Sequence, residues 1–315
     1  MWYAVAVLAL ILALIGNNRI TVTRYVVTLG AFDEDAGEMG TEPDLAEAGD
    51  ARPLGDRSRA TLRGHDTAPA ALRILQLSDL HGKRFGIGSW RLMRRFRRLE
   101  YDIVAVTNDS ITGVVLRHGA RTAASLIARL ADRHPVFFVA GNHEATSPQF
   151  PALEGRLRDA GVPVMRRDAT SVRVGDRLFT VLRLDDPRFF SPNDRWKQHR
   201  AAAFSSYTRE LATLTQSPDN LRPLILLAHR PELLDAYARA GVDLVLTGHV
   251  HGGQIRIPGG GGLLAPDQRF FPRFDTGVYR RGRTRMVVSR GLGPSIVPLR
   301  VFNPPELVFV ELRCS

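Results

Sequence analysis

Seven aspartate, asparagine and histidine residues lie in short polar motifs, each directly after an apolar run. They are Asp79, His81, Asp109, Asn142, His229, His249 and His251. This mixture of oxygen and nitrogen donors, without cysteine, suits Mn²⁺, Fe or Zn²⁺ and argues against Ca²⁺ alone or Cu(I). Seven side chains exceed what one ion needs, so the set predicts two divalent metal ions ~3.5–4 Å apart that share one carboxylate.

The stretch LTGHVHGGQ (246–254) is the hardest of these motifs to explain by structure alone. Residues two apart in an extended chain point to the same face, so His249 and His251 can reach one site. Taken singly, the aspartates and Asn142 also fit turns or caps, and His229 also fits the start of a helix. All of them together would require five independent coincidences, which favours a functional site.

The elements that must position these residues follow from the apolar periodicity. Eight apolar runs predict buried strands at 73–79, 102–109, 135–142, 178–186, 223–229, 243–249, 285–291 and 307–313. Helical patterns lie between several of them, at 89–100, 119–133, 151–160, 199–214 and 231–240. This alternation predicts an α/β domain with covered sheets. Five strands end in Asp, Asn or His, and we expect these ends to meet at one sheet edge, where open α/β sheets bind ligands.

The first sixteen residues, MWYAVAVLALILALIG, are uncharged and almost wholly apolar. We predict that residues 1–18 form an uncleaved N-terminal membrane-anchor helix. A signal peptide is less favoured, because a basic start and a clear cleavage site are both missing. Arg19 and Arg24 follow the run and no cation precedes it, which favours a cytoplasmic catalytic domain.

The remaining chain divides by composition. Residues 19–30 predict a strand that leads into the catalytic domain, and residues 31–70 predict an acidic, disordered linker insertion before a domain over 71–315. Residues 31–50 hold eight acidic residues and no basic one. The whole chain has a net charge of +11, so the rest of the chain carries a net charge of +19. The single cysteine, Cys314, excludes an internal disulfide and a thiolate metal cluster.

Five motifs together resemble the calcineurin-like metallophosphoesterases. They are SDLH (78–81), ND (108–109), GNHE (141–144), AH (228–229) and GHVH (248–251). Three further stretches resemble the bacterial membrane-associated branch of that superfamily: GHVHGGQ, SRGLG (289–293) and PPELVFVEL (304–312). The resemblance covers residues 71–315 and the VTRY strand, and it implies a four-layer β-sandwich core flanked by helices.

The resemblance also implies a role for each residue of the set. One metal is implied to bind Asp79, His81, Asp109 and His251, and the other to bind Asp109, Asn142, His229 and His249. His143 matches the catalytic histidine of the family. The implied reaction is hydrolysis of a phosphodiester or pyrophosphate by a metal-bridging hydroxide, with His143 assisting the leaving group.

Two departures from the family pattern concern the loop after the second strand of the domain. Asn108 stands where the family usually has glycine, and we expect asparagine to preserve the turn because it tolerates positive φ. Thr112 stands where the family often has Asp or Asn, a change beside the ligands that is expected to alter metal affinity by ~10-fold or more.

The substrate and the alternatives stay open at this stage. The membrane-associated resemblance favours a lipid-linked phosphoester, such as a UDP-2,3-diacylglucosamine-like pyrophosphate. An arginine-rich surface suggests a nuclease or cyclic-nucleotide phosphodiesterase instead, although nucleic acid is the less favoured partner. A non-catalytic metal- or phosphate-binding module at the membrane is a third hypothesis. Residues 183–200, with paired Phe, a Trp and several cations, fit either a substrate lid or an ordinary loop packed on the core.

Overall fold

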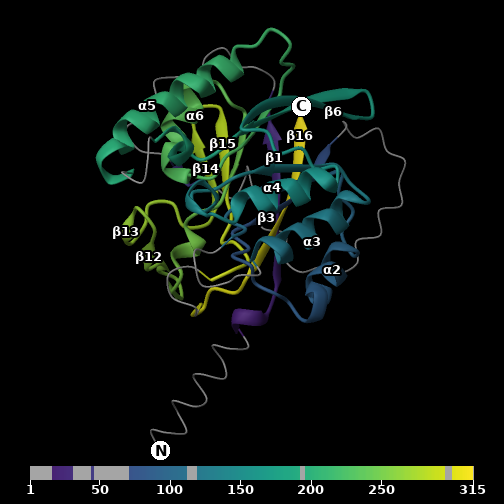
Figure 1. Cartoon of the computed structure of the whole chain (residues 1–315). Coiled ribbons are helices and arrows are strands. Elements are labelled where there is room, and N and C mark those ends of the chain that lie inside the picture. Colours follow the sequence, from purple (N-terminus) through teal and green to yellow (C-terminus); the bar gives the residue numbers. More distant parts are fainter. Residues whose placement is uncertain are drawn as a thin grey trace, which may run out of the picture.

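Two β-sheets lie face to face with helices on their outer sides in the computed structural model (Figure 1). The structure describes residues 16–30, 44–45, 71–111, 119–191, 196–294 and 300–314. Thr112 and the greater part of the predicted 31–70 linker lie outside the described residues. Two residues of that predicted linker, Asp44–Leu45, form a short strand, β2, that pairs with Arg280 and Tyr279.

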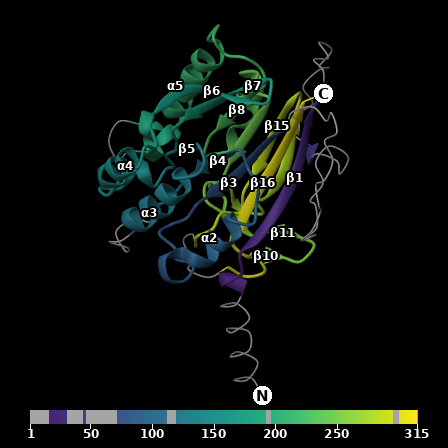
Figure 2. The same ribbon diagram turned by 90° about the vertical axis from the view of Figure 1, so that its right-hand side faces the viewer.

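The first sheet has the strand order β1-β16-β3-β4-β5. Its strands are β1 (Thr21–Leu29), β16 (Glu306–Cys314), β3 (Leu72–Ser78), β4 (Ile103–Thr107) and β5 (Val136–Val139). The strands β3, β4 and β5 are parallel, and β16 runs antiparallel to β3. Figure 2 shows β1 and β16 side by side, parallel from Thr21 opposite Glu306 to Leu29 opposite Cys314. The first and last described strands therefore share one edge of the sheet.

The second sheet has the order β2-β14-β15-β9-β8-β7-β6. Its longer strands are β14 (Gly277–Arg281), β15 (Thr284–Val288), β9 (Leu244–Thr247), β8 (Leu224–Leu227), β7 (Arg177–Leu184) and β6 (Arg167–Val174). The neighbours β7, β8, β9 and β15 are parallel, so three consecutive strands deliver their carboxyl ends in the same direction as β15. Parallel strands need crossover connections, which the helices supply.

Three apolar clusters fill the spaces between four layers. One packs α2 (Trp90–Phe96), α3 (Gly119–Ala131) and α4 (Phe150–Asp159) on the first sheet. The second fills the space between the sheets, and the third packs α5 (Trp196–Thr215) and α6 (Leu234–Arg239) on the second sheet. The predicted α/β architecture of sheets flanked by helices is confirmed.

Every predicted strand is present, with bounds shifted by one to three residues. The edge strand β6 and the strand β14 were not predicted, because neither is a continuous apolar run. In the glycine run 259–262, which predicts a loop tip, Gly259 and Gly260 lie in the turn between β10 (Arg256–Ile257) and β11 (Gly261–Gly262), and only the last two glycines are in a strand. The small strands β12 (Leu264–Ala265) and β13 (Arg269–Phe270) form a second short hairpin.

Single helical turns, η1 to η5, fill several connections. They are Ile87–Ser89, Glu144–Thr146, Pro187–Phe190, Pro231–Leu233 and His251–Gly253. At the other end of the chain, Gly16–Asn18 are helical directly before β1, and the first fifteen residues of the predicted anchor lie outside the described ranges. Among the residues that the structure describes, no helix has the length and apolar character needed to cross a membrane.

Candidate metal centre

The seven predicted ligand residues converge at the carboxyl ends of five strands. Three of these strands, β3, β4 and β5, belong to the first sheet, whereas β8 and β9 belong to the second. The prediction of a single sheet edge is therefore wrong, because the two sheets are stacked with these strand ends facing each other. All seven residues are buried, and Asn142, the most exposed, keeps 9% of its surface accessible.

The backbone at this site is held in an uncommon conformation. Asp79, His81, His249 and His251 have φ values of 49°, 47°, 73° and 50°. Residues other than glycine rarely adopt the left-handed region, and such strain is found where surrounding contacts impose it. Here the His81 amide donates to the Asp109 carbonyl at 2.9 Å, and the His249 amide donates to Asp79 Oδ2 at 3.1 Å. These hydrogen bonds fix the strained backbone and bring side chains from both sheets to one point.

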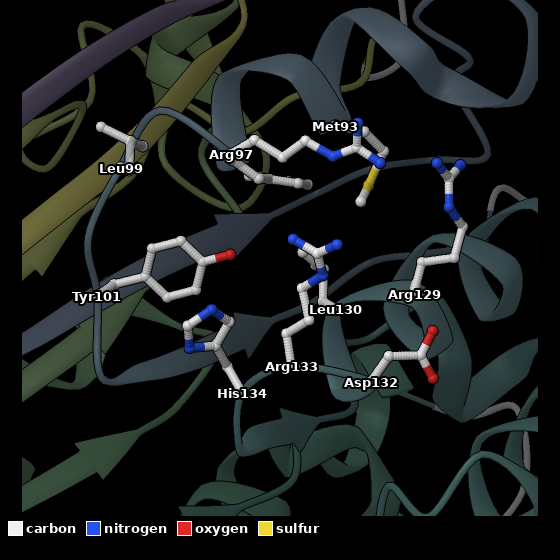
Figure 3. Close-up of a pocket in the computed structure, with 10 residues that line it drawn as sticks. Met93, Arg97, Leu99, Tyr101, Arg129, Leu130, Asp132, Arg133 and His134 are labelled. Carbon is white, nitrogen blue, oxygen red and sulfur yellow. The ribbon is translucent and has the colours of Figure 1, made fainter.

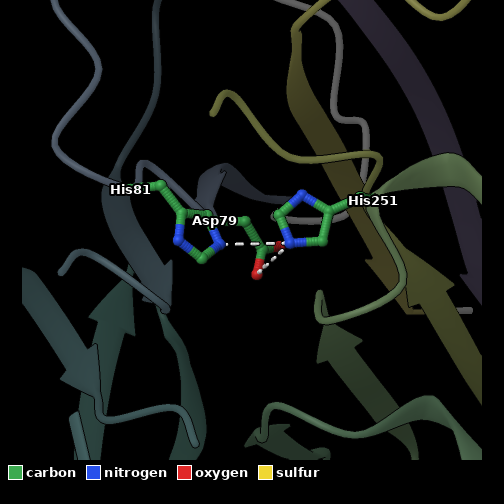
Figure 4. Close-up of side chains that lie close together, drawn as sticks. All are labelled: Asp79, His81 and His251. Carbon is green, nitrogen blue, oxygen red and sulfur yellow. Dashed lines mark hydrogen bonds and ion pairs between the residues drawn. The ribbon is translucent and has the colours of Figure 1, made fainter. Parts of the chain in front are cut away.

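The first cluster consists of Asp79, His81 and His251 (Figure 4). The His81 and His251 Nε2 atoms are 3.1 Å apart, and His251 Nε2 is 3.8 Å from Asp79 Oδ1. Burial lowers the pKa of His81 to about 3 and also lowers the pKa of His251. Both rings are therefore neutral at pH 7, with two nitrogen atoms and a buried carboxylate directed at one point. This donor set fits a divalent cation.

The second cluster consists of Asp109, Asn142, His229 and His249. His229 Nε2 is 3.2 Å from Asp109 Oδ2 and 3.1 Å from Asn142 Oδ1. Ligand atoms of Asp109, His229 and His249 lie within 4.8 Å of one another. Burial would lower the pKa of His229, but the charge and hydrogen bond of Asp109 outweigh it and raise the pKa to about 10. His229 in the second cluster is therefore protonated at pH 7, whereas both imidazoles of the first cluster are neutral.

Asp109 lies near both clusters, and His143 lies beside Asp109 on the side that solvent reaches. Ligand atoms of His81, Asp109 and His143 also lie within 4.8 Å of one another, so Asp109 is near both clusters. The His143 amide donates to Asp109 Oδ1 at 2.9 Å, and His143 Nε2 is 3.9 Å from Asp109 Oδ2. The His143 side chain is 41% exposed, unlike the seven buried residues. It is the histidine of the site that solvent can reach.

Comparisons with known proteins agree with this arrangement. Residues 72–253 match the family described as calcineurin-like phosphoesterase. The chain belongs to this family. It is a metal-dependent phosphoester hydrolase, as the resemblance predicted.

Two bacterial relatives extend over most of the phosphoesterase. An uncharacterized metallophosphoesterase of Aquifex aeolicus is 27% identical over 246 residues, which are 77% of this chain and 85% of that protein. The phosphodiesterase YaeI of Escherichia coli is 26% identical over 255 residues, 77% of this chain and 83% of the relative. Among solved structures, GAP50, the anchor in the inner membrane complex of Plasmodium, aligns with a TM-score of 0.44. It is 16% identical and covers 70% of this chain and 72% of that chain.

Glu144 supports the phosphoesterase site in a way the sequence did not reveal. Its Oε1 atom accepts hydrogen bonds from the Ser110 and Ile111 amides, and its Oε2 atom accepts one from the Gly141 amide. The carboxyl group is buried, and burial together with the charge of Asp109 raises its pKa well above the usual range. Glu144 thus joins the loops that follow β4 and β5. Its place in the GNHE motif was visible, but its role was not.

Asp267 is a further residue that sequence reasoning missed. Its Oδ2 atom is 3.3 Å from His249 Nε2 and accepts a hydrogen bond from Arg230 Nη1 at 2.6 Å. The hydrogen bond with His249 and the charge of Arg230 hold the pKa of this carboxyl well below its usual range. No local pattern identifies Asp267, because it lies in a hairpin loop that only the fold brings to the second cluster.

A polar support lies behind His251. Arg300 Nη2 is 3.4 Å from His251 Nδ1, and Asn303 donates to the His251 carbonyl at 2.7 Å. Both residues are buried, with 1% of their surface exposed. They fix the position of His251 from the segment before β16.

Glycines allow the strand ends to approach one another. A Cβ atom on Gly141 would overlap the Asn108 carbonyl and Asp109 Oδ1, and one on Gly248 would overlap Ser78 Oγ and Asp79 Oδ2. Neither glycine has positive φ, so close approach rather than a turn requires them. Asn108 does not have positive φ, so its place here does not depend on the tolerance of asparagine for that conformation.

The aromatic residues of 183–200 do not form an open lid over the site. Phe189 lies against Phe150, Phe190 against Tyr207, and the buried Trp196 against Phe204. The alternative of an ordinary segment packed on the core is the one observed.

A separate cavity of about 220 Å³ lies beside α2 and α3 (Figure 3). Its lining includes Arg97, Arg129, Arg133, Tyr101 and His134. It contains none of the seven predicted ligand residues and is distinct from the metal centre.

Proposed function

We propose that this phosphoesterase hydrolyses a phosphodiester or pyrophosphate with one divalent ion at each cluster. The single observation that carries the proposal is the position of Asp109, within reach of His81 on one side and His229 on the other. Asp79, His81, Asp109 and His251 would hold one ion, and Asp109, Asn142, His229 and His249 the other. Bound Mn²⁺, Fe or Zn²⁺ would neutralise the phosphoryl oxygens and activate water.

His143 is suited to move the proton in this reaction. It is partly exposed at the edge of the site, and its Nε2 atom is 3.9 Å from the buried Asp109 carboxylate. From this position the Nε2–H of the ring can be donated to the departing oxygen. No side chain needs to form a covalent bond with phosphorus.

The proposed substrate is linked to a lipid, and the enzyme is anchored in the membrane by its N-terminal segment with the catalytic domain on the cytoplasmic side. The uncharged apolar residues 1–16 support this placement, as do the motifs similar to the membrane-associated branch. A UDP-2,3-diacylglucosamine-like pyrophosphate combines the two required features, a scissile phosphoester and acyl chains.

Hydrolysis of bis(p-nitrophenyl) phosphate and p-nitrophenyl phosphate by the full chain in detergent with Mn²⁺ tests the reaction. We expect metal-dependent diester cleavage that Asp109→Asn abolishes. Asp176→Asn, a matched change at an exposed turn, should retain the wild-type rate. Equal rates for Asp109→Asn and the wild type would refute the proposal.

A further inference from the structure

Most of the exposed large apolar side chains lie in segments that adjoin residues of the metal centre along the chain. Six of the eight that are exposed among the described residues stand in these segments, in loops, at the start of α2 or in the short strands β10 and β13: Ile87, Trp90, Ile257, Phe270, Phe271 and Phe302. Soluble surfaces rarely gather large apolar groups, and such gatherings mark interaction sites. The location therefore needs an explanation beyond chance exposure.

Five of these six side chains follow or adjoin a residue of the site along the chain. Ile87, which is 95% exposed, and Trp90 follow the loop after His81. Phe270 and Phe271 follow Asp267, which contacts His249. Phe302, 72% exposed, stands between Arg300 and Asn303, the two residues that support His251. These exposed apolar groups thus stand in segments that lead to residues of the metal centre.

The chain enters the fold at this same end. The Lys83 ammonium donates to the carbonyl and to Oδ1 of Asn17, the latter at 3.2 Å, which holds Asn17 beside the loop after His81. In Figure 1 the turn Gly16–Asn18 lies at the lower end of the molecule, between α2 and the β12–β13 hairpin. Residues 1–15, which are uncharged and nearly all apolar, join the fold at this point.

The charge of this end is strongly positive. Residues 82–99, GKRFGIGSWRLMRRFRRL, contain seven Lys and Arg residues and no Asp or Glu. Helix α2 buries Leu92, Met93 and Phe96 against the core, so that its arginines are directed outward. A surface with arginines around exposed Trp and Ile side chains matches the interfacial region of a bilayer with anionic headgroups.

We propose that the end formed by these loops docks on an anionic lipid bilayer, which places the metal centre at the level of the headgroups. Ile87, Trp90, Phe270, Phe271 and Phe302 enter the boundary between headgroups and acyl chains, ~5–10 Å deep. This inference rests on the proposed function for its substrate: a phosphoester whose acyl chains stay in the bilayer while its phosphate reaches His143.

Site-directed spin labelling of the full chain in phosphatidylcholine/phosphatidylglycerol vesicles tests this surface. Cys314→Ala removes the only cysteine, and Ile87→Cys or Phe302→Cys provides a labelling position. Leu221→Cys is the matched control, because Leu221 is 47% exposed but lies before the opposite end of β8. All three proteins retain the same N-terminal segment, so that a difference between labels reports the orientation of the folded domain.

We expect the labels at positions 87 and 302 to collide preferentially with oxygen, with an oxygen-to-nickel-chelate collision ratio several-fold higher than at position 221. Equal, nickel-accessible labels at all three positions would overturn the proposal, because the domain would then stand away from the bilayer. Labels at 87 and 302 shielded from both reagents would also overturn it, in favour of a protein partner or a second copy.

Hydrolysis of bis(p-nitrophenyl) phosphate by the same labelled proteins separates the two proposals. This ester is soluble and does not require docking. Lipid contact without hydrolysis would contradict the proposed function and leave the docking surface supported, whereas hydrolysis without lipid contact would contradict the docking surface alone.

Discussion

The two clusters of the metal centre use similar side chains but balance their charges differently. In the first cluster, His81 and His251 face each other at 3.1 Å, and burial lowers the pKa of both rings. In the second cluster, His229 faces the Asp109 carboxylate at 3.2 Å, and its pKa is raised to about 10. Burial disfavours the protonated form of all three imidazoles, and only at His229 does an adjacent carboxylate, that of Asp109, outweigh it.

This difference implies two modes of cation binding. The first cluster has proton-free nitrogen donors at neutral pH, so that a cation can bind His81 and His251 without displacing a proton from either ring. In the second cluster, the proton on His229 already neutralises Asp109, and a cation must replace it. Metal ligands must be deprotonated, so binding to the second cluster is coupled to proton release.

Removing one histidine from each cluster is expected to have the largest effect. His251→Ala should remove the ion of the first cluster and His229→Ala that of the second. Hydrolysis of bis(p-nitrophenyl) phosphate should fall in both by at least ~100-fold, the upper range seen when only a partner of a ligand is changed. Metal content measured by mass spectrometry, together with the rates, checks this.

His199→Ala, at a histidine of α5 outside both clusters, is the matched control and should keep both ions. If either cluster variant retained two ions, the division of the site into two clusters would be wrong.

Added bulk at the two glycines should have an intermediate effect. Gly141→Ala forces a Cβ into the Asn108 carbonyl in the second cluster, and Gly248→Ala forces one into the Ser78 and Asp79 side chains in the first. Overpacking of this kind destabilises by about 1–3 kcal/mol. We expect the larger loss for Gly141→Ala, because backbone yields less readily than a side chain, as measured by thermal unfolding midpoints.

Gly155→Ala serves as the comparison, because no atom lies within 4 Å of the added Cβ in helix α4. It should raise the midpoint slightly, since alanine favours helix over glycine by up to ~1 kcal/mol. Midpoints unchanged in both site variants would show that the strand ends are not packed as closely as described.

The last prediction concerns a difference between the two clusters in the pH dependence of their metal affinity. In the His251→Ala protein, which retains the second cluster, His229 is protonated below its pKa of about 10. Raising the pH therefore removes the competing proton, and Mn²⁺ affinity should rise about tenfold per unit between pH 6 and 8.

In the His229→Ala protein, the remaining His81 has a pKa of about 3 and is already neutral over this range. Its Mn²⁺ affinity should stay nearly constant from pH 6 to 8. Calorimetric titration in buffers of different ionisation enthalpy measures both the affinity and the protons released. Equal slopes for the two proteins would remove the distinction between the clusters.

The strands could be predicted where their residues are apolar on both faces. β8 (Leu224–Leu227) is buried at every position, so its sequence LILL is sufficient. β6 (Arg167–Val174) alternates exposed and half-buried residues at the sheet edge, and its sequence RDATSVRV carries little apolar signal. The pairing of strands into two sheets was also not predictable, because periodicity records burial and not the identity of the neighbour.

The seven candidate ligand residues could be picked out from the sequence because each stands shortly after an apolar strand. Their supports could not be. Asp267 reaches His249 from a loop 18 positions along the chain, and Arg300 reaches His251 across 49 positions. Such contacts depend on the path of the chain and leave no spacing pattern. The candidate ligands were therefore visible in the sequence, and the residues that hold them in place were hidden.

The pairing of β1 with β16 imposes an order on synthesis. Thr21, at the start of β1, hydrogen-bonds with Pro305, 284 positions later. A ribosome adds ~5–20 residues per second, so synthesis of β16 follows that of β1 by roughly 15–60 seconds. β16 also pairs with β3, which leads to Asp79, so the first sheet is completed only after β16 (Glu306–Cys314) has been synthesised. A chain that stops before Glu306 lacks this strand and cannot complete the sheet that carries Asp79.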